Sequence, residues 1–299
     1  YFSYDSKKSG GLTVSHLRFG KTPIQSTYLI DAADFVACHN PSYVTKYDMV
    51  SKVKDGGVFL LNSPWSAEEM DKQLPAKMKQ QLAKKHVRFY NIDAIDLALK
   101  VGINTIMQAA FFKLAEVIPY EQADEYMKAY AKKTYGKKGD AIVKKNWDAI
   151  DIAISGLVEI KVPQEWANAT TGAEPVKIKS TEYFQNFVEP ILAQEGDSLP
   201  VSAFDPAGVV PTGTTKFEKR GIAVTVPEWQ IDKCIQCGTC SLVCPHACIR
   251  PIYASEEVMK GAPEGYQTKP ATGKEFAGMQ YRMQVSPLDC TGCGNCVQV

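Results

Sequence analysis

The chain has 299 residues and an almost balanced charge, with 34 Lys and Arg against 33 Asp and Glu, so its formal net charge is +1 at pH 7. This balance does not favour nucleic acid or a membrane surface as a partner. With 45% hydrophobic and 22% charged residues, the composition is that of a globular protein long enough for two domains. No apolar run approaches the roughly 18 residues of a membrane span, and the first residues do not resemble a signal peptide.

Residues 1 to about 172 alternate short apolar runs with helical patterns, which indicates parallel strands joined by crossover helices. The Gly56-Gly57 pair is expected to turn the chain into a strand that is covered on both faces. Ser66 and Glu69 have the spacing of a capping box, which marks a helix start. Strands are expected at 12–19, 33–38, 58–62 and 87–92, and helices at about 42–53, 76–85, 93–100, 104–117, 120–135 and 140–155.

The composition changes at about Gly172, because several stretches rich in Pro and Gly follow one another as far as Gly213. Such stretches are typical of an extended linker, here with one short helix at about 181–192. A cysteine-rich module starts near Thr215. The predicted domains are therefore 1–172, 173–214 and 215–299.

Four cysteines of this module are separated by two, two and three residues and are followed by proline. This is the spacing of the bacterial ferredoxin motif, whose thiolates ligate 4Fe-4S clusters. Gly238 in the middle of the motif permits the tight turn that directs neighbouring thiolates at one cluster. The motif consists of Cys234, Cys237, Cys240, Cys244 and Pro245.

A second run repeats the spacing, and Gly294 takes the place of Gly238, so an internal duplication is the simplest interpretation. The fourth cysteine of this run would fall directly after Val299, so we expect the chain to be an internal piece of a longer protein. The two runs are farther apart than a minimal ferredoxin needs, and we place an insertion at about 253–279, looped over the module. The second run consists of Cys290, Cys293 and Cys296.

In two-cluster ferredoxins the fourth cysteine of a run ligates the cluster of the other run. This rule assigns Cys244 to the cluster of the second run and leaves the fourth ligand of the first cluster beyond the chain. Structural zinc prefers two separated pairs of ligands, so zinc and a disulfide framework fit the spacing less well. Cys248 fits neither run and is expected to be a small, buried, apolar side chain. Clusters of this kind need reduced thiolates, which favours a cytoplasmic location.

The first domain carries no sequence motif for nucleotide binding, for hydrolysis or for thiamine diphosphate. His16 and His39 are expected to be hydrogen-bonded structural residues. Cys38 and His39 do not form a catalytic pair, because adjacent strand residues point to opposite faces, so Cys38 is expected in the core. We therefore predict no catalytic residue here. Lys7 and Lys8 beside a glycine turn are a weak signal for an anionic ligand.

Four segments of the first domain, followed by the cysteine module, resemble the pyruvate:ferredoxin (flavodoxin) oxidoreductase family over essentially the whole chain. The resemblance implies an α/β fold: a Rossmann-like gamma-type domain that helps bind coenzyme A, a linker region, and an α+β ferredoxin-like domain with two 4Fe-4S clusters. It also implies that Lys7, Lys8, Ser9 and Asn104 contact coenzyme A. The segments are 5–11, 15–19, 33–39 and 60–64.

The same resemblance implies the oxidative decarboxylation of a 2-oxo acid, with pyruvate as the expected substrate, to acetyl-CoA and CO2. Thiamine diphosphate, Mg²⁺ and a third 4Fe-4S cluster would lie elsewhere in the enzyme, and ferredoxin or flavodoxin would accept the electrons. A homodimer and a role in anaerobic metabolism are further implications. The alternatives are a stand-alone electron-transfer protein whose first domain docks a partner, and a zinc-stapled interaction module.

Overall fold

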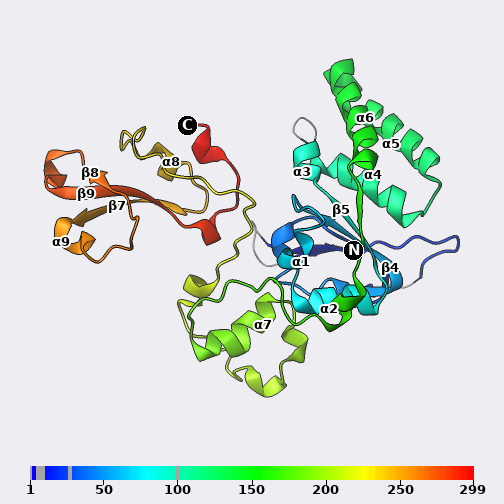
Figure 1. Cartoon of the computed structure of the whole chain (residues 1–299), viewed down its shortest axis with the longest axis horizontal. Coiled ribbons are helices and arrows are strands. Elements are labelled where there is room, and N and C mark those ends of the chain that lie inside the picture. Colours follow the sequence, from blue (N-terminus) through cyan, green and yellow to red (C-terminus); the bar gives the residue numbers. More distant parts are fainter. Residues whose placement is uncertain (1, 5–10, 26–28, 99–101) are drawn as a thin grey trace. The chain divides into compact units, whose positions relative to one another are not determined.

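The computed structural model describes residues 2–4, 11–25, 29–98 and 102–299 (Figure 1). The chain divides into two compact units, one made mainly of residues 13–177 and 187–199 and the other mainly of residues 178–186 and 200–299. Among the described residues, no helix is both long enough and apolar enough to cross a membrane.

The first unit is built on a four-stranded sheet with the order β3-β4-β5-β6. Its first three strands are parallel, and the last six residues of β4 are buried because helices pack on both faces of the sheet. The edge strand β6 is antiparallel to β5 and was not predicted. The predicted α/β class is confirmed. The strands are β3 (Ala33–Cys38), β4 (Val53–Asn62), β5 (Arg88–Ile92) and β6 (Val158–Ile160).

Alternate residues of β4 enter two separate cores, one on each face of the sheet. Phe59 and Leu61 pack with α1 (Met70–Gln73) and α2 (Ala76–Lys84). Val58 and Leu60 pack in the core formed by three longer helices on the other face. These helices are α4 (Ile103–Ala115), α5 (Tyr120–Tyr135) and α6 (Asp140–Ser155), close to the predicted ranges.

The capping box predicted at Ser66 and Glu69 is present just before α1, which begins at Met70. The backbone N–H of Ser66 donates to Oε2 of Glu69 over 2.8 Å, and the backbone N–H of Glu69 donates to Oγ of Ser66 over 3.3 Å. This reciprocal pair satisfies donors that the first turn of a helix leaves free. The helix predicted at 93–100 is only α3 (Ala94–Leu97) among the described residues.

Two predictions for the first unit are wrong. Residues 42–53 form no continuous helix, because Asn40 and Asp48 accept hydrogen bonds from the backbone N–H groups of Ser42 and Ser51 and so stabilise short turns instead. Gly56-Gly57 lies within β4 and is not a turn before it. The pairing with β3 shifts register there, and Gly56 has a φ of 69°, which indicates a β-bulge.

The strand predicted at 12–19 is much shorter than expected. Only β2 (Thr13–Ser15) forms, and it pairs antiparallel with β1 (Phe2–Tyr4) in a separate two-stranded sheet. The short helix predicted at 181–192 consists of a π-helical turn (Phe184–Val188) and α7 (Glu189–Leu192).

The second unit contains an antiparallel sheet with the order β7-β9-β8. The ends of the insertion predicted at 253–279 belong to two paired strands, so the segment between them extends a hairpin and adds the short strand β8. The elements are α8 (Thr239–Leu242), β7 (Ile249–Ser255), α9 (Glu256–Met259), β8 (Lys269–Pro270) and β9 (Met279–Val285).

The ammonium group of Lys79 is buried between α1 and α2 in the first unit. The side chain of Lys79 is only 3% exposed. Its Nζ donates to the carbonyl oxygen of Asp71 over 2.9 Å and to Oδ1 of Asp71 over 3.1 Å. Nε1 of Trp166 donates to the same Oδ1 over 2.9 Å. The hydrogen bond from Lys79 holds the pKa of Asp71 below its usual range.

We predict that Asp71→Ala lowers the free energy of unfolding by about 2 kcal/mol, because it leaves a buried ammonium without its counterion. Asp148→Ala, which removes the partner of the exposed Lys144, should cost less than about 0.5 kcal/mol. Urea unfolding followed by tryptophan fluorescence measures both. The Asp71 contribution should be present at neutral pH and lost as the pH falls through the lowered pKa of Asp71. Equal effects of the two substitutions would contradict this prediction.

Candidate iron-sulfur site

The two cysteine runs lie on loops with the same backbone conformation. Gln236 and Gly238 in the first loop have φ angles of 61° and 74°. Gly292 and Gly294, at the matching positions of the second loop, have φ angles of 72° and 77°. Left-handed residues at the same two places in both runs turn the chain in the same way. The duplication inferred from the spacing is therefore also present in the backbone.

Each loop directs hydrogen-bond donors at its own sulfur atoms. The backbone N–H of Gln236 donates to Sγ of Cys234, and that of Gly292 donates to Sγ of Cys290, both over 3.4 Å. The hydroxyl of Thr239 donates to Sγ of Cys237 over 3.3 Å and lowers the pKa of that exposed thiol. Such donors stabilise a thiolate and tune the potential of a cluster bound to it.

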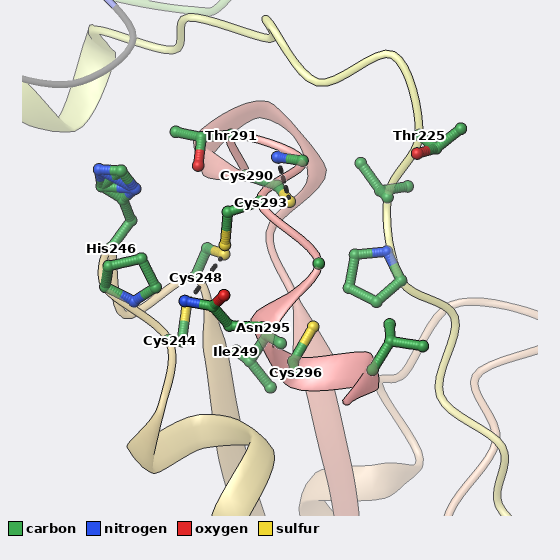
Figure 2. Close-up of a pocket in the computed structure, with 16 residues that line it drawn as sticks. Thr225, Cys244, His246, Cys248, Ile249, Cys290, Thr291, Cys293, Asn295 and Cys296 are labelled. Atoms are coloured by element: carbon green, nitrogen blue, oxygen red, sulfur yellow. Dashed lines mark hydrogen bonds between the residues drawn. The ribbon is translucent and has the colours of Figure 1, made fainter. Parts of the chain in front are cut away.

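Cysteines from both runs line one pocket of about 110 Å³. Figure 2 shows the side chain of Cys244, from the end of the first run, beside those of the second run. Apolar residues such as Val226, Pro227 and Ile249 also line the pocket and limit the access of water. The second run contributes Cys290, Cys293 and Cys296.

The thiols also fall into two groups by their electrostatic interactions, one group with the second run and one with the first. Burial raises the pKa of Cys296, and the charges of Cys293, Cys290 and Cys244 raise it further. Burial also raises the pKa of Cys240, where the further contributions come from Cys234 and Cys237. Cys244 therefore lies with the second run, although it belongs to the first run in the sequence.

Cys248 is a fifth thiol in the pocket. It is buried, as expected, but its Sγ lies 3.4 Å from Sγ of Cys244. Burial and, to a smaller extent, the neighbouring Cys244 together raise the pKa of Cys248 to about 12. The Cys248 thiol is thus neutral at physiological pH and is able to donate its proton to a neighbouring sulfur.

Two buried polar atoms near the cysteines suit a group that accepts hydrogen bonds. Within the described part of the chain, the hydroxyl of Tyr281 and Nδ1 of His246 have no hydrogen-bond partner. The Tyr281 hydroxyl interacts electrostatically with Cys234, Cys240 and Cys237, and His246 lines the pocket of the second run. Cysteine sulfur and inorganic sulfide would accept from such donors, so the residues fit 4Fe-4S clusters.

Comparison with known proteins assigns the chain to a family. Residues 1–156 match the family model described as pyruvate ferredoxin/flavodoxin oxidoreductase. The chain belongs to the pyruvate ferredoxin/flavodoxin oxidoreductase family. Residues 170–223 match a domain of unknown function, and residues 233–299 match a 4Fe-4S dicluster domain. The dicluster match and the grouped cysteines support iron-sulfur clusters and not zinc. No three His, Cys, Asp or Glu side chains among the described residues are placed to hold a single metal ion.

Curated members of the family are similar to this chain over its full length. It is 59% identical to the pyruvate:ferredoxin oxidoreductase of Moorella thermoacetica, 50% identical to the pyruvate-flavodoxin oxidoreductase of Enterobacter agglomerans and 46% identical to that of Klebsiella pneumoniae. Each comparison covers 100% of this chain and 26% of the relative. The chain therefore spans about a quarter of the length of these oxidoreductases.

Four residues were expected to contact coenzyme A. Lys7, Lys8 and Ser9 lie outside the residues that the structure describes. Asn104 is exposed at the second position of α4, next to the free N–H groups of the helix start. These four residues stay predictions.

The interpretation of His16 and Cys38 as structural residues is confirmed. Nδ1 of His16 accepts a hydrogen bond from the backbone N–H of Ile30 over 3.1 Å, whereas His39 is exposed and its structural role stays a prediction. Cys38 is 2% exposed, its thiol donates to the carbonyl oxygen of Asn40 over 3.1 Å, and burial raises its pKa to about 12. Cys38 is a core residue.

Residues other than cysteine that approach the loops were missed. Tyr281 and Lys269 come from the β sheet, and their approach depends on strand register. Gln236 was missed because a non-glycine residue with positive φ leaves no mark in a sequence. An alignment of homologous sequences would have been needed to identify these three residues.

We predict that Cys244→Ser alters the cluster of the second run and not that of the first. Because Cys248 lies beside Cys244, the substitution should be made together with Cys248→Ala, and Cys248→Ala alone should keep both clusters. Electron paramagnetic resonance of the reduced protein provides the measurement. Cys293→Ser and Cys237→Ser supply reference spectra for damage to either cluster. A Cys244→Ser spectrum that matches Cys237→Ser would contradict the crossed assignment.

Proposed function

We propose that this chain conducts electrons through two 4Fe-4S clusters within an enzyme that oxidatively decarboxylates pyruvate to acetyl-CoA and CO2. The main support is the pocket in which a cysteine of the first run joins the three cysteines of the second. That combination is the ligand pattern of a two-cluster ferredoxin. Cys244, Cys290, Cys293 and Cys296 would hold one cluster. Cys234, Cys237 and Cys240 would hold the other, with a fourth ligand from outside this chain.

The proposed reaction requires groups outside this chain. Thiamine diphosphate with Mg²⁺ would release CO2 from pyruvate, the acetyl group would pass to the sulfur of coenzyme A, and a third cluster would receive electrons first. Two electrons are released for each pyruvate, so two molecules of a one-electron acceptor, ferredoxin or flavodoxin, are reduced for each acetyl-CoA. When bound, the clusters supply one-electron steps between donor and acceptor.

The residues of this chain would hold and shield the clusters. The thiolates supply the ligands, and the N–H groups of Gln236 and Gly292 stabilise the negative charge on sulfur. The apolar lining of the pocket limits the access of water, which affects the potential of a cluster.

We further propose that the first domain helps bind coenzyme A through Lys7, Lys8, Ser9 and Asn104, and that the enzyme is a cytoplasmic homodimer. The predicted boundaries 1–172, 173–214 and 215–299 are kept for its domains.

The proposal is tested on the complete protein, purified without oxygen, by following its visible absorption as pyruvate and then coenzyme A are added. We expect pyruvate to bleach the cluster absorption and coenzyme A to accelerate the bleaching. Clusters that no 2-oxo acid reduces would instead identify a stand-alone electron carrier. A colourless protein would identify the zinc-stapled module.

The coenzyme A contact of Asn104 is tested separately. We predict that Asn104→Ala raises the coenzyme A concentration needed for half-maximal rate by about fivefold, the loss of roughly one hydrogen bond. The slow bleaching by pyruvate alone should not change. Gln108→Ala, an exposed residue one turn further along α4, is the matched control. If both variants behave alike, Asn104 does not contact coenzyme A.

A further inference from the structure

We propose that Tyr281 and Lys269 raise the reduction potential of the cluster held by Cys234, Cys237 and Cys240. In this proposal the Tyr281 hydroxyl donates a hydrogen bond to a sulfur of that cluster, and the Lys269 ammonium group adds positive charge beside it. The inference rests on the proposed function, because it requires that the first run binds an iron-sulfur cluster.

The first observation is the unsatisfied hydroxyl of Tyr281. This residue lies on the central strand β9 and is 0% exposed. Its hydroxyl has no hydrogen-bond partner among the residues that the structure describes. Buried hydroxyl groups in native proteins are almost always hydrogen-bonded, because leaving one unpaired costs free energy. A partner outside the described residues is therefore expected, and a cluster bound to the first run would supply one.

The second observation is the direction in which this residue faces. Strand pairing sets Tyr281 opposite Lys269 on β8, and directly opposed residues point to the same face of a sheet. Nζ of Lys269 donates to the carbonyl oxygens of Ile231 and Cys234, each over 2.9 Å. The face that carries Tyr281 is thus the face that contacts the first cysteine loop. The Tyr281 hydroxyl also interacts electrostatically with the thiols of that loop.

The ring of Tyr281 is held on two sides. Trp229 makes an edge contact with it at a centroid distance of 6.2 Å, and Tyr253, its neighbour on β7, makes another at 5.2 Å. Such contacts fix the orientation of an aromatic ring and therefore the direction of its hydroxyl.

The sheet and the cysteine loop are also joined by Gln236. Its Nε2 donates to the carbonyl oxygen of Pro270 over 2.8 Å. Its Oε1 accepts from the backbone N–H of Thr272 over 3.0 Å and from the hydroxyl of Thr272 over 3.1 Å. Gln236 has a positive φ, which these bonds hold in place, and it lies between two cysteines of the first run. The distance between β8 and the loop is therefore fixed.

The effect on potential follows from charge. Reduction adds an electron to an anionic cluster, so a hydrogen-bond donor or a cation nearby stabilises the reduced state more than the oxidised state. Removing either group should make the cluster harder to reduce. Lys269 and Tyr281 contact the first loop, whereas the second run has other neighbours, among them His246, Cys248 and Arg250, so its cluster should not respond.

The test is a potentiometric titration of the complete protein, purified without oxygen and followed by electron paramagnetic resonance. We expect Tyr281→Phe, which keeps the ring, to retain iron and to make the potential of the first cluster more negative. A tenfold change in its reduction equilibrium corresponds to about 59 mV. The cluster of the second run should keep its potential. Tyr253→Phe is the matched control, because Tyr253 shares the aromatic contacts but is 37% exposed.

Lys269→Gln provides a second variant that leaves Tyr281 intact, so the proposal can still be tested if Tyr281→Phe does not fold. It should lower the potential of the same cluster. An unchanged potential in the variants that retain iron, or equal shifts of both clusters, would overturn the proposal. Failure of the proposed function is a different result, because the unsubstituted protein would then contain no cluster at the first run or would not be reduced by pyruvate.

Discussion

The pairing of β7 with β9 is the interaction on which the cysteine site depends. Ile249, shortly after the first cysteine run, pairs with Val285, shortly before the second. The backbone N–H of Ser286 continues this pairing by donating to the carbonyl oxygen of Cys248 over 2.8 Å. Two segments that are distant in sequence are thereby held side by side, so that Cys244 lies beside the second run. Without this pairing, Cys244 would not join the three cysteines of the second run in one pocket.

The sequence was most informative where one local pattern is sufficient to specify a structural element. Cysteine spacing identified both loops, and helical periodicity located α5 and α6 at the predicted residues. Prediction from the sequence failed where side-chain hydrogen bonds to the backbone compete with helix formation, as in the turns at Asn40 and Asp48. It also failed where a strand forms only because it pairs with a distant strand, as in the three-residue strand β6. The approach of Tyr281 to the first loop depends on register and on a long-range contact, neither of which a single sequence carries.

The first domain shows how polar residues at a site-like position can be entirely structural. Parallel α/β sheets bind ligands beyond the carboxyl ends of their strands. At this edge, Oγ of Ser63 donates to Oδ1 of Asn91 over 2.8 Å, and Oδ1 of Asn62 accepts from the backbone N–H of Ala94 over 2.9 Å. Nδ2 of Asn91 donates to two backbone carbonyls in the same loop. These side chains hold the strand ends together.

The two cysteine loops share a backbone but differ in their surroundings. The first loop accepts hydrogen bonds from a lysine on β8, whereas the second has the buried thiol of Cys248 on one side and basic residues such as Arg250 beside Cys290. Because charge, burial and hydrogen bonds to sulfur set the potential of a cluster, a duplicated motif need not give equal potentials. Electrons move in one direction along a pair of clusters only if the potentials differ suitably. The residues that the duplication did not copy, such as Lys269, Tyr281 and Cys248, are those able to create that difference.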